Sequence, residues 1–151
     1  MNFRLALLLL LGFSIHISTF GSRTASPLIA LQRGESAFTV GALLSAYWFV
    51  PIFFAIAAGR WTDRIGARKP LLISSALQFA GLLIPALMPG VPAMAASAVL
   101  IGSAHIVGVI ARTNSIGASV SAESRGSAFV WLTMSILAGI TIGPPIAGFA
   151  L

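Results

Sequence analysis

Long apolar stretches, separated by short polar connections, make up almost the whole chain. A helix that spans a membrane needs about 20 mostly apolar residues, and it satisfies its backbone hydrogen bonds internally. The pattern therefore predicts an all-α integral membrane protein with about five transmembrane helices, in which residues 1–151 form one domain. We place the helices at residues 4–31, 38–58, 70–88, 92–116 and 127–151.

Composition supports the same class of protein. Hydrophobic residues make up 58% of the chain and charged residues 8%, whereas a soluble domain carries about 25% charged residues. The net charge of +6 comes from basic residues at segment ends, and this indicates membrane orientation rather than binding of nucleic acid. The chain has no cysteine, which excludes disulfides and cysteine metal sites. We expect no metal site and no cofactor.

The placement of lysine and arginine predicts the orientation. Cytoplasmic connections are enriched in basic residues, and a cytoplasmic N-terminus puts most of them on that side. We therefore expect a multi-pass protein of the cell membrane, which is the inner membrane in a bacterium. Arg4 followed by the apolar residues 5–11 leaves a signal peptide as an alternative, but the apolar stretch continues beyond the core of such a peptide. The predicted cytoplasmic residues are Arg4, Arg60, Arg64, Arg68, Lys69, Arg112 and Arg125, against Arg23 and Arg33 outside.

A charged segment, GRWTDRIGARK at residues 59–69, separates the second and third apolar stretches. Five of the twelve charged residues of the chain lie in it. Gly59 and Gly66 bracket Asp63, and glycine permits the backbone angles of a tight reversal. A plain cytoplasmic hairpin would explain the basic residues but not a single aspartate between two glycines.

This segment resembles the loop between the second and third helices of the major facilitator superfamily of secondary transporters. Trp61 replaces the usual leucine and Ala67 takes the first basic position. The resemblance implies a gating role for this loop. It also implies a fold of twelve helices in two halves, so that this chain corresponds to an incomplete six-helix N-terminal bundle, truncated in or after the fifth helix. The matching residues are Gly59, Asp63, Arg64, Gly66, Arg68 and Lys69.

Small residues recur every four positions in the fifth stretch, at Ser135, Gly139, Gly143 and Ala147. Such spacing lets two helix backbones approach closely. Residues 139–148 also resemble the fifth-helix motif of superfamily antiporters, although Ala147 replaces one glycine and Val130 stands where an upstream glycine is expected. The resemblance implies antiport; close packing with a kink is the alternative. The motif positions are Gly139, Gly143, Pro144 and Gly148.

Polar residues form a stripe in each of two spans. In the first span His16 and Arg23 lie seven residues apart on one helical face, and His105 and Arg112 do so in the fourth. Ionisable residues inside a membrane are costly and indicate functional sites, so we expect these four to line a cavity for substrate or protons. Histidine titrates near physiological pH, which suits proton coupling.

Each of these residues has alternatives. Arg23 could extend its charge to the outer interface, and Arg112 could anchor a helix end or pair with Asp63 in a gate. The histidines could be hydrogen-bonded packing residues, or two axial ligands of a haem.

Together with the ionisable positions within the spans, the resemblance to this superfamily implies a secondary active transporter that exports small molecules by proton-coupled alternating access. The sequence shows no catalytic constellation, because Asp63 has no second acid nearby and no serine has an evident base. Expected partners are a small-molecule substrate, protons, the lipid bilayer, and a missing C-terminal half or partner chain, since five helices cannot supply alternating access alone. The alternatives are a uniporter or symporter, or a non-transporting membrane partner or fragment.

Overall fold

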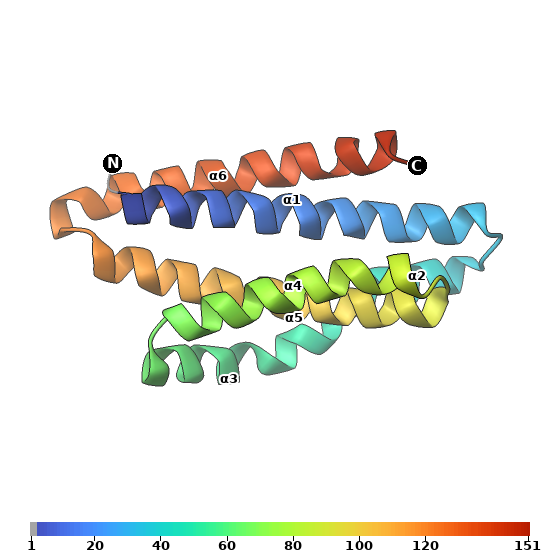
Figure 1. Ribbon diagram of the computed structural model, residues 1–151, viewed down its shortest axis with the longest axis horizontal. Coiled ribbons are helices and arrows are strands. Elements are labelled where there is room, and N and C mark those ends of the chain that lie inside the picture. Colours follow the sequence, from blue (N-terminus) through green and yellow to red (C-terminus); the bar gives the residue numbers. More distant parts are fainter. Residues whose placement is uncertain (1–2) are drawn as a thin grey trace.

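The computed structural model describes residues 3–151, and these residues form α-helices joined by short connections (Figure 1). Five spans are long and apolar enough to cross a membrane, because α2 and α3 together make up the second one. The prediction of an all-α, multi-pass membrane protein with five spans is therefore confirmed. The helices are α1 (Phe3–Gln32), α2 (Ala37–Ala46), α3 (Phe49–Ile65), α4 (Arg68–Leu87), α5 (Val91–Ser119) and α6 (Ala122–Phe149).

Helix α5 is the central helix of the bundle. Within its most apolar stretch 44% of the residues are buried by the protein, compared with 17% to 22% in the other spans. Its inward positions carry small residues such as Ala98, Ala104 and Ala111, none of which is exposed. Large apolar side chains such as Phe53 and Leu72 are exposed instead, which suits contact with lipid.

The second span is broken between α2 and α3, where we had predicted one continuous helix over residues 38–58. Pro51 has no N–H group for the carbonyl of Tyr47, one turn earlier, and this weakens the helix there. Gly102 of α5 provides the space: a Cβ at this position would overlap the Tyr47 carbonyl and lie 2.8 Å from Pro51 Cγ. The Tyr47 hydroxyl is 3.1 Å from Ser26 Oγ of α1. The irregular backbone is thus covered by protein, as membrane depth requires.

Two connections are shorter than predicted, because the helices continue beyond the apolar stretches. The predicted 59–69 loop is mostly helical, since α3 ends at Ile65 and α4 begins at Arg68. The reversal falls on Gly66, whose φ of 77° favours glycine. The predicted connection at 117–126 shrinks likewise, because α5 ends at Ser119 and α6 begins at Ala122.

Helices α1 and α6 run in the same direction and pack closely along their length (Figure 1). Ser135 Oγ donates a hydrogen bond of 2.6 Å to the Leu9 carbonyl. A Cβ on Gly139 would lie 2.9 Å from the Phe13 carbonyl oxygen, and one on Gly143 would lie 2.7 Å from that of Ile17. Contacts therefore advance by four residues on both helices. We call Ser135, Gly139, Gly143 and Ala147 the small-residue seam.

Candidate functional site

Aromatic and basic side chains meet where α1, α5 and the α2–α3 break come together. The rings of His16 and His105 have centroids 4.8 Å apart and lie edge to face at 75°. The Trp48 ring is 5.5 Å from that of His105, and Arg23 Cζ lies 5.4 Å from the Trp48 centroid. Phe20 completes the group, 6.3 Å from His105. We call these five residues the histidine cluster.

Both histidines of the cluster are buried, with 3% of His16 and 7% of His105 exposed. His16 Nδ1 lies 2.7 Å from the Gly12 carbonyl oxygen, and because a carbonyl can only accept, Nδ1 carries the proton. His105 Nδ1 is buried and has no hydrogen-bond partner within residues 3–151. The direct contact of the two rings leaves no space for a porphyrin between them, so axial haem ligation is wrong.

Arg23 and Trp48 connect the cluster to the broken span. Arg23 is half-buried, and its guanidinium lies over the Trp48 ring as a cation–π contact. The side chain is therefore directed at the break. Sequence reasoning missed the position of Trp48. The signal was present in Pro51, three residues further on, which marks the end of regular helix.

Arg112 lies inside the bundle, with 1% of its surface exposed. Its side chain occupies a slot beside two glycines: a Cβ on Gly108 would lie 3.2 Å from Nη1, and one on Gly12 would lie 3.7 Å from Nε. Neither Nη1 nor Nη2 has a hydrogen-bond partner in the described part of the chain. This position argues against a surface anchor and leaves a buried cation available for interaction.

Asp63 does not pair with Arg112, which corrects the expected gate contact. Its Oδ1 accepts a hydrogen bond of 3.0 Å from Asn114 Nδ2 instead. Positions 112 and 114 differ by about 200° around a helix of 3.6 residues per turn. Arg112 therefore faces the interior while Asn114 faces the end of α3. Sequence reasoning missed Asn114 because a neutral amide near a helix end gives no distinctive signal.

The charged segment at residues 59–69 borders an open hollow of about 730 Å³. We call this end of the bundle the charged end. Gly66, Arg68 and Asp63 line the hollow from one side, and Asn114 and Arg125 from the other. The remaining motif positions lie nearby: Gly59 is half-buried on α3, and the side chains of Arg64 and Lys69 are exposed.

Gln78 of α4 joins the polar face of α1. Its Nε2 lies 2.7 Å from Ser18 Oγ and 3.1 Å from Thr19 Oγ1, and donates to both. The side chain is 5% exposed, and its Oε1 has no partner among the described residues. Sequence reasoning did not identify these contacts.

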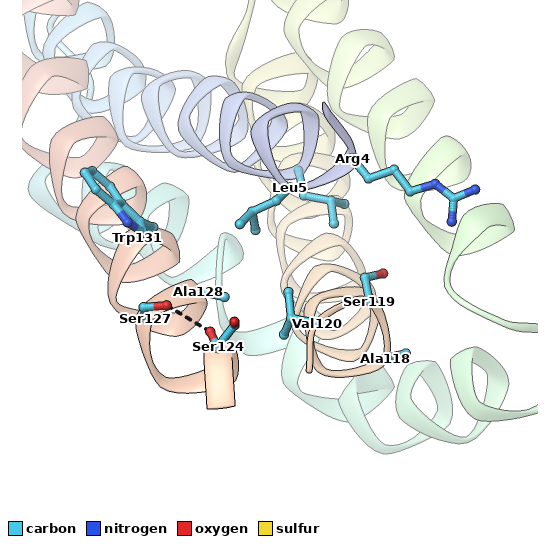
Figure 2. A pocket seen from close by; sticks show the side chains of 10 residues that line it. Arg4, Leu5, Ala118, Ser119, Val120, Ser124, Ser127, Ala128 and Trp131 are labelled. Carbon is cyan, nitrogen blue, oxygen red and sulfur yellow. Dashed lines mark hydrogen bonds between the residues drawn. The ribbon is translucent and has the colours of Figure 1, made fainter. Parts of the chain in front are cut away.

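A second cavity, of about 670 Å³, opens at the start of α1 (Figure 2). Leu5 borders it from α1, Val120 from the α5–α6 connection, and Ser124 and Trp131 from α6. No residue of the histidine cluster lines it, and Ser119 borders both this cavity and the hollow near Asp63. The cavity therefore belongs to the charged end of the bundle and is separate from the cluster.

Comparison with known proteins identifies the family of the chain. The tetracycline resistance proteins of class E and class B from Escherichia coli are 36% and 32% identical to the chain over 117 and 110 residues. Each alignment covers 73% of this chain, which spans about a quarter (27%) of each relative. No solved structure gives a match. The family model described as Major Facilitator Superfamily matches residues 8–151, and the chain therefore belongs to this superfamily.

Proposed function

We propose that this chain is part of a secondary active transporter that exports small molecules by proton-coupled alternating access. The observation that carries the proposal is the burial of His16, His105 and Arg112 within the spans. Buried ionisable groups cost free energy in a membrane and are retained at transport pathways. Family membership and the named resistance function of the relatives support export of a small organic molecule. Together they indicate a transporter and not an enzyme.

The proposed transport unit contains more than these five spans. Transporters of this architecture place the substrate between repeated halves that rock against each other, and the chain spans 27% of its relatives. We therefore propose that residues 1–151 are a partial N-terminal domain, whose other half is a further segment or a partner chain. We also propose that the N-terminus and the charged end face the cytoplasm.

We propose that the charged end acts as a gate. The hydrogen bond between Asp63 and Asn114 joins the end of α3 to α5, and breaking it would loosen the contact between the two helices at this end. Gly66 sets the reversal, while Arg64, Arg68 and Lys69 supply exposed positive charge around it. In α6, Gly139, Gly143, Pro144 and Gly148 form the proposed antiporter motif.

Flux through the assembled transporter tests the proposal. The assembly that contains this chain would be purified from native membranes and reconstituted in liposomes that hold an acidic interior. We expect radiolabelled tetracycline to accumulate inside, and we expect a protonophore to abolish the accumulation. The Arg112→Met variant should lose this accumulation, whereas Arg33→Met, in the exposed α1–α2 connection, should retain it.

Different failures have different meanings. Entry of tetracycline that does not depend on the pH gradient and stops at equal concentrations on both sides would overturn proton coupling and favour a uniporter. Accumulation that requires the reversed gradient would favour a symporter. Absence of flux for tetracycline and for a panel of other small organic molecules would overturn transport and favour a non-transporting membrane partner.

A further inference from the structure

The acidic residues of this chain are absent from the middle of its spans. There are three of them: Glu35 in the α1–α2 connection, Asp63 in the last turn of α3, and Glu123 in the first turn of α6. None of these can carry a proton at the depth of the histidine cluster. Imidazole is the side chain whose ordinary protonation change falls near physiological pH, and both histidines of the chain lie in this cluster.

We propose that His16 and His105 form a single proton-binding site that takes up and releases one proton. The inference rests on the proposed proton coupling and identifies the groups that carry it. The hydrogen bond from His16 Nδ1 to the Gly12 carbonyl leaves Nε2 as the basic nitrogen of that ring. His105 Nδ1 has no partner in the described chain. Each ring therefore has a nitrogen that is not committed to the backbone.

The contact between the rings limits the site to one proton. A proton taken from water converts one ring to an imidazolium, and its release restores two neutral rings. A second proton would place two positive charges in adjacent rings whose centroids are 4.8 Å apart, and such like charges oppose each other strongly away from water. Groups coupled in this way titrate as a pair rather than as two independent residues.

The surroundings of the pair connect the proton to the conformation. On α1, Arg23 reaches the pair through Trp48, and on α5, Arg112 follows His105 by two helical turns. The titratable group at the break is the Tyr47 hydroxyl, which shares a hydrogen bond with the Ser26 hydroxyl. Helix α4 contributes the neutral Gln78, and α6 contributes Gly139 beside His16.

Two arginines thus flank the pair, and the carboxylates of the contacting elements, Asp63 and Glu123, lie at helix ends away from it. The affinity of the pair for a proton depends on the distance to each guanidinium. Because Trp48 lies on the break of the second span, a shift of α2 and α3 moves its ring relative to both Arg23 and His105. Such a shift changes the proton affinity, and by reciprocity a bound proton favours one arrangement of the span.

Nuclear magnetic resonance of the two imidazoles tests the pair directly. The complete chain, labelled with 15N-histidine, would be titrated in lipid nanodiscs between about pH 4 and pH 9, around the ordinary range of histidine. We expect both rings to respond together to a first proton, with a second step more than about one pH unit away. Independent, single-step titration of the two rings, or no protonation of either, would overturn the proposal.

Variants that keep a ring provide the control. In His105→Phe the ring contact is retained without a basic nitrogen, and His16 should then titrate in one step with a changed midpoint. His16→Phe gives the reciprocal measurement on His105, so that the test survives if one variant fails to fold. A midpoint that is the same in the variant and in the unaltered chain would overturn the coupling between the rings.

This test separates the inference from the proposed function. Paired titration together with gradient-independent flux would support the proton site and refute proton-coupled transport. Gradient-dependent flux together with independent histidines would support the transporter and overturn this site, in which case the proton carrier lies elsewhere in the assembly.

Discussion

Two faces of α1 are packed in opposite ways. Towards α6, the small-residue seam brings backbone against backbone, as at Gly143 and Ile17. Towards α4 and α5, the same helix presents His16, Ser18 and Thr19 to other polar side chains. The first face is a steric fit between small residues. On the second, buried polar atoms of several partners lack hydrogen bonds within residues 3–151.

The contrast separates residues that hold the bundle together from residues that have another use. Close packing of small residues stabilises helix association in membranes, and the seam supplies it. A buried cation such as Arg112 costs several kcal/mol of desolvation unless it is paired. We infer that the polar face is retained for function. Removing its unpaired buried charge should therefore raise stability, whereas enlarging a residue of the seam should lower it.

The largest expected effect is on the seam. In Gly143→Ala the new Cβ meets the Ile17 carbonyl oxygen and the Gly21 nitrogen, at 2.7 and 3.0 Å, and both are backbone atoms that cannot move aside easily. We expect a loss of about 1 to 3 kcal/mol in the free energy of unfolding, measured by denaturation in mixed micelles. Gly148→Ala is the matched control, because no atom lies within 4 Å of its Cβ position. Equal losses in both variants would contradict the steric explanation.

A change of the opposite sign is expected on the polar face. Arg112→Met removes a buried guanidinium and keeps an unbranched side chain, so that the unfolding free energy should rise by about 1 kcal/mol. The proton-driven accumulation proposed above should be lost in the same variant. Arg33→Met, at an exposed position, should change stability by less than about 0.5 kcal/mol. Destabilisation by Arg112→Met would show that the arginine is structural.

The hydrogen bonds from Gln78 give an effect of similar size to that of Arg112 but of the opposite sign. Gln78→Leu removes two bonds to α1, and interhelical bonds in membranes contribute about 0.6 kcal/mol each. We expect a loss of about 1 kcal/mol, measured in the same denaturation experiment. Gln32→Leu, at the exposed end of α1, is the control. No loss in Gln78→Leu would mean that burial of the amide cancels its bonds.

The smallest effect is expected for the hydroxyl within the seam. Ser135→Ala deletes the bond to the Leu9 carbonyl but keeps a small side chain, so the loss should be about 0.6 kcal/mol. Ser127→Ala serves as a control because the Ser127 hydroxyl donates its hydrogen bond within α6, to the Ser124 carbonyl. A loss as large as that of Gly143→Ala would show that the hydroxyl, rather than close packing, holds the seam.

Sequence reasoning predicted the features that depend on length and spacing along one helix. The spans follow from the apolar stretches, because the thickness of a bilayer fixes the length of a helix that crosses it. The contact face of α6 follows from small residues at intervals of four. The break near Tyr47 was missed, because the apolar stretch continues through it and Pro51 alone marks the irregularity.

Contacts between helices could not be predicted in the same way. Gln78 and Ser18 are 60 residues apart in the sequence, and Asp63 and Asn114 are 51 apart. A helix that is apolar on most faces does not reveal which side meets its neighbour. The sequence therefore suggested that Asp63 pairs with the charged Arg112. In the structure Asn114 is the partner, because its position around the α5 axis faces α3.

The four-residue step of the seam determines how α1 and α6 can move. A slide by one residue would bring a larger side chain against a backbone that accepts only glycine, so the next permitted register lies four residues, or about 6 Å, away. We expect the two helices to travel as one rigid body during any smaller motion. His16 then moves with α6, while His105 belongs to α5, and the boundary between the moving parts passes between the two rings.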